Sequence, residues 1–224
     1  MEAKQGAFDQ CSAWLARLAE SNKGHSTSGY RLVRERFVEV PVEGDALQER
    51  PGNVVVSDAM SIHSRLFLFH VGRSQKMQPQ DVGEGITQVV PVIAALVRAS
   101  HESKTIESNL VAIEQPELHL HPSLAAKLGD LFISTMFTER GARALIETHS
   151  EHLLLRILRR IRQTTDGELP EHIPPVKPDD VCVLWVDNLG DGTTFTRLRI
   201  SDNGRWLDRW PDGFFSERHE ELFE

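Results

Sequence analysis

The chain has 224 residues, of which 40% are hydrophobic, and its 33 Asp and Glu outnumber its 25 Lys and Arg. It is long enough to bury a core, and its net charge of -8 disfavours nucleic-acid binding by the chain as a whole. Cys11 and Cys182 match no metal or disulfide spacing, so we expect packing roles in a reducing cytoplasm. The sequence shows no signal peptide and no apolar run of membrane-spanning length.

Residues 1–80 predict a helix followed by an antiparallel meander. Apolar side chains recur at helical spacing over Phe8–Leu18. Alternating, β-branched and aromatic-rich segments then predict strands at Tyr30–Val42, Asn53–Ser57 and Arg65–Val71, with turn residues between them.

Residues 81–187 have the pattern of an α/β core. A helix with apolar spacing runs from Ile86, and Pro91 is tolerable in it only near the first turn. Leu110–Ile113 is a short apolar run, as expected of a strand buried on both faces, and Pro122 begins a helix after it.

A second strand-loop-helix unit follows, with a strand at Ala142–Ile146 and a helix that Ser150 caps. Two such units predict a parallel sheet flanked by helices. Val181–Val186 predicts another buried strand, and alternation over Thr193–Ile200 predicts a hairpin at the edge of the sheet. We expect residues 188–224 to form an accessory hairpin and tail.

Polar residues follow the two central predicted strands, at Glu114–Glu117 and Glu147–Ser150. Loops at the carboxyl ends of parallel strands form the ligand crevice of such sheets. Glu114 is placed to hold magnesium through water, and His149 to contact a terminal phosphate or orient the attacking water.

A loop with two glycines, Asp81–Gln88, directly precedes the helix from Ile86. Free N–H groups and the dipole at a helix N-terminus favour an anion there. This effect is worth only about 0.3–1 kcal/mol at an exposed site, and many such loops bind nothing.

Three segments together resemble the ABC-type ATPases of the AAA class, in their OLD-like and RecF-like form. Val82–Gln88 is similar to the signature motif, Asn109–Pro122 to the Walker B motif and D-loop, and Glu147–Glu151 to the H-loop. Trp210–Phe215 resembles a short C-terminal domain of unknown function in one branch of these proteins. The resemblance runs from about Tyr30 to the end of the chain.

The resemblance implies a P-loop NTPase fold in which ATP and Mg²⁺ join two subunits. Glu114 would hold Mg²⁺, His149 would contact the terminal phosphate, and His121 and Pro122 would lie at the subunit boundary in the D-loop. The signature residues that would cover the nucleotide of the other subunit are Gly83, Gly85, Thr87 and Gln88.

Two departures from the family pattern bear on catalysis. No Gly-x-x-x-x-Gly-Lys-Ser/Thr P-loop occurs, and Asn22–Ser26 does not supply one. Gln115 stands at the usual catalytic glutamate position, and loss of a general base costs about 10²–10⁴-fold in rate. Either Glu117 replaces it, or hydrolysis is slow and the site is a binding switch. The chain alone is therefore an incomplete ATPase.

Several other side chains have competing interpretations. A zinc site is one interpretation of three histidines, His119, His121 and His149. The first two form only a His-x-His within a loop, so we favour the nucleotide site. Four arginines late in a helix either bind nucleic-acid phosphates or complement the helix dipole, and the acidic chain favours the dipole. These arginines are Arg156, Arg159, Arg160 and Arg162.

The aromatic residues near the C-terminus either form a docking patch or pack back onto the parent domain, and we favour packing. They are Trp206, Trp210, Phe214 and Phe215.

The leading functional hypothesis is a nucleotide-dependent dimerisation switch whose P-loop comes from an N-terminal part or a partner chain. Family analogy suggests DNA transactions or anti-phage defence. The alternative is a non-catalytic interaction module that docks to an ATPase or an effector protein. A metal-dependent nuclease would need more carboxylates, for which Asp187 and Asp191 at a predicted turn are the late candidates.

Overall fold

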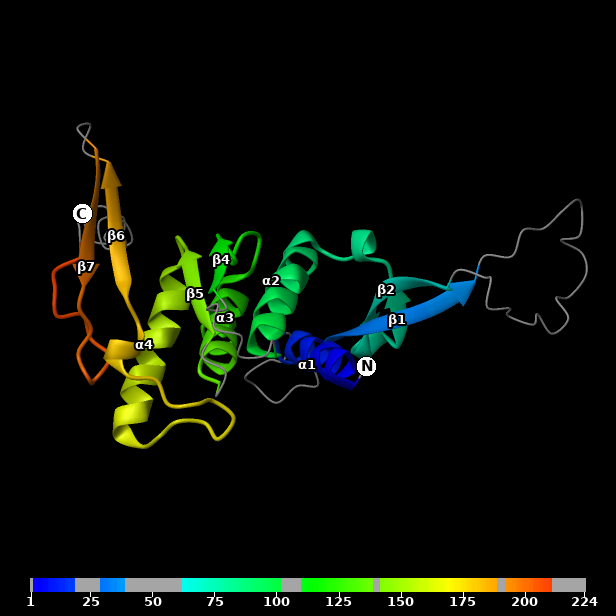
Figure 1. The fold of residues 1–224 in the computed structure, drawn as a ribbon, viewed down its shortest axis with the longest axis horizontal. Helices are drawn as coiled ribbons and strands as arrows, with labels where there is room; N and C mark the ends of the chain where they lie inside the picture. Colours follow the sequence, from blue (N-terminus) through cyan, green and yellow to red (C-terminus); the bar gives the residue numbers. More distant parts are fainter. Residues whose placement is uncertain are drawn as a thin grey trace, which may run out of the picture.

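The structure of the protein is a computed structural model, which describes residues 2–18, 29–38, 62–101, 110–138, 142–188 and 192–210. An antiparallel sheet lies at one end, four helices and a parallel strand pair lie in the middle, and a β-hairpin lies at the other end (Figure 1). Among the described helices, none has the length and apolar content needed to cross a membrane.

The N-terminal part is a helix followed by a three-stranded antiparallel sheet. Helix α1 (Glu2–Leu18) precedes β1 (Tyr30–Val38), β2 (Ile62–His70) and β3 (Gln75–Met77), which pair in the order β1-β2-β3. The predicted helix and meander are confirmed. The strand expected at Asn53–Ser57 lies outside the described residues, and β3 was not predicted because three residues are too few to show an alternation.

Helix α2 (Glu84–His101) begins two residues before the predicted start and contains Pro91 in its interior. The expectation that this proline is tolerated only near the first turn is therefore wrong. Pro91 is exposed, and it removes one backbone hydrogen bond at a cost of about 3 kcal/mol. Apolar burial on the opposite side compensates, at about 1.5–3 kcal/mol for each large side chain. The buried apolar residues of α2 are Val89, Ile93, Leu96, Val97 and Ala99.

Two strand-loop-helix units form the central layer, as predicted. β4 (Leu110–Glu114) leads to α3 (Pro122–Met136), and β5 (Arg143–Glu147) leads to α4 (Glu151–Asp166). The strands are parallel. Ser150 caps α4 as predicted, because its hydroxyl accepts a hydrogen bond from the backbone N–H of the third helical residue at 3.2 Å.

The parallel pair is covered on one face only within the described residues. Inward side chains of both strands pack against the helical core, and these are Val111, Ile113, Ala144 and Ile146. On the other face Leu110 is 60% exposed and Leu145 is 62% exposed. The prediction of a strand buried on both faces is therefore wrong, because the described part of the chain supplies a helical layer to one face only.

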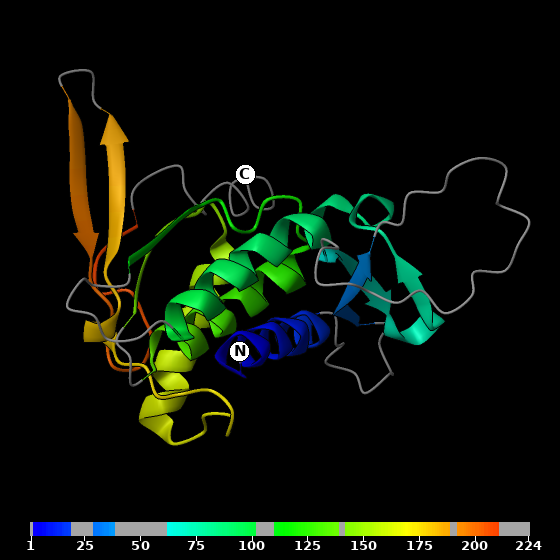
Figure 2. The ribbon, with the colours of Figure 1, turned by 45° about the vertical axis from the view of Figure 1, so that its right-hand side comes forward.

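Strands β6 (Val183–Asn188) and β7 (Thr193–Leu198) form the predicted hairpin, but as a separate two-stranded sheet. Figures 1 and 2 place it at the opposite end of the molecule from β1 and β2. The prediction of a buried strand at Val181–Val186 is wrong, since Val186 is 53% exposed. The hairpin is also not at the edge of the β4–β5 sheet, because no ladder joins β5 to β6 among the described residues.

The tail packs back onto this hairpin through aromatic contacts. The ring centroids of Trp185 and Trp210 lie 6.4 Å apart, and those of Trp206 and Trp210 lie 4.8 Å apart. The preferred packing interpretation is confirmed for the two tail tryptophans. Phe214 and Phe215 lie outside the described residues.

The two cysteines have different environments. Cys11 lies in α1 and is buried in the core, and its burial raises the pKa of its thiol. Cys182 is exposed. The expected packing role therefore holds for Cys11 and is wrong for Cys182.

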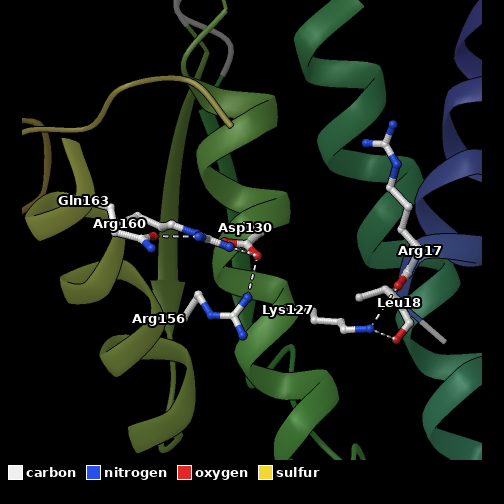
Figure 3. A network of polar contacts seen from close by, with 7 residues as sticks. All are labelled: Arg17, Leu18, Lys127, Asp130, Arg156, Arg160 and Gln163. Carbon is white, nitrogen blue, oxygen red and sulfur yellow. Dashed lines mark hydrogen bonds and ion pairs between the residues drawn. The ribbon is translucent and has the colours of Figure 1, made fainter. Parts of the chain in front are cut away.

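A buried ion-pair cluster joins α3 to α4 (Figure 3). The carboxylate of Asp130, 8% exposed, accepts hydrogen bonds from Nε and Nη2 of Arg160 at 2.7 and 2.9 Å. Arg156 also donates to Asp130, and Arg160 donates to Gln163 Oε1 at 2.7 Å. The preferred dipole interpretation is wrong for these two arginines, because they pair with Asp130 and no basic residue lies in the last turn of α4.

Candidate functional site

The ends of β4 and β5 bring two carboxylates to one edge of the sheet. Glu114 and Glu147 are register partners, and both are exposed. The backbone N–H of Gln115 donates to the Glu147 carbonyl at 2.9 Å, which extends the pairing one residue beyond β4. No role was expected for Glu147, although its position at the end of its strand matches that of Glu114.

A tight turn follows β4 and fixes the backbone conformation around Glu117. Gln115 and His119 both have positive φ angles, of 45° and 59°, a conformation that costs a non-glycine residue roughly 1–2 kcal/mol. The N–H of Leu118 donates to the Gln115 carbonyl at 3.1 Å, and the N–H of Leu120 donates to the Glu117 carbonyl at 2.9 Å. The backbone on both sides of Glu117 is therefore constrained.

Glu117 connects this turn to the loop after β5. Its Oε1 accepts a hydrogen bond from the backbone N–H of His149 at 2.8 Å. Its Oε2 is enclosed and has no hydrogen-bond partner among the described residues. The structure thus brings two predicted site residues together, but it does so through the backbone of His149. Residues 32 positions apart give no local signal of such a bond.

The first turn of α2 packs directly against the turn after β4. A Cβ atom added to Gly85 would lie 2.4 Å from the carbonyl oxygen of His119, whereas one added to Gly83 would meet nothing within 4 Å. The glycine at position 85 therefore permits the close approach of two backbones. Thr87 Oγ1 donates to the Pro79 carbonyl at 3.0 Å, and Gln88 is exposed.

We expect Gly85→Ala to lower the free energy of unfolding by about 1–3 kcal/mol, because its Cβ would displace the His119 backbone. Gly83→Ala, which has open space around it, is the matched control and should change stability little. Urea unfolding of the two variants measures the difference. Equal stabilities would contradict close packing at Gly85.

His121 and Pro122 begin α3. His121 is the N-cap, and its Nδ1 accepts a hydrogen bond from the N–H of Ser123 at 3.2 Å while Pro122 occupies the first helical position. Both residues are exposed. They have a structural role in starting the helix, and their place at a subunit boundary stays a prediction.

The described residues contain no group of three or more His, Cys, Asp or Glu that could hold a metal ion. His119 Nε2 instead lies 3.8 Å from a carboxylate oxygen of Glu84. Asp187 lies in β6 rather than at the predicted turn, and Asp191 lies outside the described residues. The geometry therefore lends no support to the zinc or nuclease interpretations.

Residues 17–156 match the family model described as "AAA domain, putative AbiEii toxin, Type IV TA system". The match covers more than half of the chain and includes the glycine loop, both strand ends and the loop with His149. The chain belongs to this AAA family. The family membership confirms the ATPase resemblance, whereas the similarity of Trp210–Phe215 to a C-terminal domain stays a prediction.

Two similar solved structures come from SMC proteins. One, from work on ATP-driven dimerization and DNA-stimulated activation of SMC ATPases, has 10% identity and a TM-score of 0.48, with 100% of this chain and 97% of that chain covered. The other is an SMC head bound to the C-winged helix domain of ScpA, with 10% identity, a TM-score of 0.47 and coverage of 88% and 43%. No curated protein matches the sequence.

Proposed function

We propose that this member of the AAA family is one half of an ATP-dependent switch, which works with a P-loop carried by another polypeptide segment. The proposal rests on the way in which the predicted site residues come together at the carboxyl ends of β4 and β5. There Glu114 and Glu147 lie side by side, and the Glu117 hydrogen bond ties the loop of His149 to the turn after β4.

The donor set at this edge suits a hard cation. Magnesium in nucleotide sites is bound by one or two carboxylates together with phosphate oxygens and water. Glu114 and Glu147 are two exposed carboxylates in register, so Glu114 would hold Mg²⁺ through water with Glu147 beside it. Bound Mg²⁺ would neutralise charge on the nucleotide phosphates.

The half-covered sheet supports the need for a second segment. Strands of parallel sheets are covered on both faces in α/β proteins, yet Leu110 and Leu145 point away from the core of this chain. A partner segment that carries the P-loop would cover this face and bring its bound ATP toward Glu114. Gly83, Gly85, Thr87 and Gln88 would then cover the nucleotide of a second subunit, with dimerisation as the output.

We propose defence as the biological setting. The family description, "putative AbiEii toxin, Type IV TA system", supports this proposal. DNA remains a candidate partner by analogy, without support from net charge.

The test is ATP binding and turnover by this chain alone and mixed with the product of the sequence encoded immediately upstream. We expect only the mixture to bind and hydrolyse ATP. Glu114→Ala should lower turnover by about 10–100-fold, the usual loss on removing a group that supports a bound metal ion through its ligands. His149→Ala should also lower turnover, because it removes the proposed contact to the terminal phosphate.

Glu171→Ala is the matched control, because this exposed carboxylate lies in the loop beyond the far end of α4. It should leave turnover unchanged. If neither the chain nor the mixture binds ATP, the switch is contradicted.

The alternative function is an interaction module without catalysis. The exposed apolar face of β4–β5 favours it, since exposed apolar patches mark docking surfaces. Such a module should bind its ATPase or effector partner equally well with and without ATP and should not dimerise in response to ATP, whereas the switch requires ATP for dimerisation. Analytical ultracentrifugation of the mixture with and without ATP and Mg²⁺ separates them.

A further inference from the structure

We infer that Glu117 is a positioning residue that fixes the loop of His149, and that it does not replace the missing general base. The positioning itself is a property of this chain. Its consequence for hydrolysis rests on the proposed function.

The turn after β4 aims the Glu117 side chain at the neighbouring loop. Pro116 is buried, and the flanking positions Gln115 and His119 have left-handed backbones. Together with the hydrogen bond from the N–H of Leu120 to the Glu117 carbonyl, these constraints leave the turn little freedom. The carboxylate is therefore presented in one direction.

The two carboxylate oxygens of Glu117 are both unsuited to accept a proton from water. Oε1 already accepts the N–H of His149 at 2.8 Å, a charge-assisted bond of the stronger kind. Oε2 is closed off from solvent and has no partner among the described residues. A general base must come within about 2.6–3.2 Å of the proton it removes, and the enclosed Oε2 is not open to a water molecule in this structure.

The hydrogen bond instead completes the support of the loop after β5. On one side Glu147 pairs with Glu114 in the sheet. On the other side Ser150 caps α4, and its own N–H donates to Thr148 Oγ1 at 3.0 Å. Glu117 adds a third attachment at His149, so the loops after β4 and β5 move as one. A ligand that displaces the turn after β4 will therefore also displace His149.

Three substitutions at Glu117 separate positioning from base catalysis. Glu117→Gln keeps an oxygen that can accept the His149 N–H but removes the base. Glu117→Asp keeps the carboxylate but shortens its reach, and Glu117→Ala removes both. Thermal melting by circular dichroism shows whether each variant is folded. If Glu117→Ala does not fold, the comparison of Gln with Asp carries the test.

The first measurement uses the chain alone, without nucleotide. Hydrogen exchange of the His149 amide, followed by NMR, should be slow in the parent chain and in Glu117→Gln. It should accelerate at least about tenfold in Glu117→Asp and Glu117→Ala, because no side-chain oxygen at position 117 then reaches the His149 N–H. Unchanged exchange in all variants would overturn the inference.

The second measurement is ATP turnover in the mixture with the upstream product. Positioning predicts that Glu117→Gln stays within about threefold of the parent while Glu117→Ala loses at least about tenfold, as for other supporting groups. A base predicts that Glu117→Gln loses about 10²–10⁴-fold. That loss, with the His149 amide still protected, would overturn the inference. A mixture without turnover contradicts the proposed function, and the exchange measurement still decides the positioning role.

Discussion

Asp130→Ala is expected to lower the free energy of unfolding by about 3–5 kcal/mol. The carboxylate is the shared partner of Arg156 and Arg160, whose side chains are only 14% and 9% exposed. Its removal leaves two buried guanidinium groups without their counter-charge, and desolvation is costly for an unpaired ion. These ion pairs connect α3 to α4. We therefore also expect the unfolding transition of Asp130→Ala to be less cooperative, because α4 is held less firmly to α3.

Urea unfolding followed by circular dichroism measures this effect. The matched control is Asp208→Ala, which breaks the more exposed pair between Asp208 and Arg199 together with the hydrogen bond that the Arg199 N–H donates to Asp208. It should cost less stability than Asp130→Ala, because the pair is closer to solvent. Asp130→Asn keeps the shape and one acceptor, so it should lie between the parent and Asp130→Ala. If the Asp130 and Asp208 variants lose the same stability, the cluster does not hold the two helices together.

The central layer was predictable because its signals are local. Pro122 and Ser150 begin their helices as their residue types predict. Two apolar runs, each followed by a helix, predict parallel strands. Glu114 and Glu147 are the last residues of these strands, so they lie next to each other at one edge of the sheet. Such features depend on residues within a few positions of one another.

The features that sequence reasoning missed depend on distant residues. The bond from His149 to Glu117 and the pairing of Asp130 with Arg156 and Arg160 join residues 26–32 positions apart. The predictions of buried strands were wrong for a different reason. An apolar run such as Leu110–Ile113 indicates that a strand suits a covered sheet, but it does not say which polypeptide covers it. The same limit applies to Val181–Val186, whose apolar pattern predicts a buried strand but does not say which elements would bury it.

Gln115→Glu is expected to raise the ATP turnover of the mixture with the upstream product by about 10²–10⁴-fold. Gln115 directly follows Glu114, and its backbone N–H donates to the Glu147 carbonyl. The new carboxylate would therefore lie next to the proposed Mg²⁺ site at Glu114. An amide cannot accept the proton of attacking water, whereas a carboxylate can. The mixture that contains the parent chain should therefore hydrolyse bound ATP slowly.

Single-turnover hydrolysis with and without Mg²⁺ checks this expectation, with Gln115→Ala as the matched control. That control removes the amide without adding a base, so it should not accelerate turnover. The result also bears on Glu117, since a base already present there would leave little for Gln115→Glu to add. A large acceleration that survives Glu117→Gln would place the proton acceptor at position 115 and leave Glu117 to hold His149. If ATP binds normally and Gln115→Glu changes nothing, a missing base is not what limits hydrolysis, and slow turnover must come from how the two segments assemble.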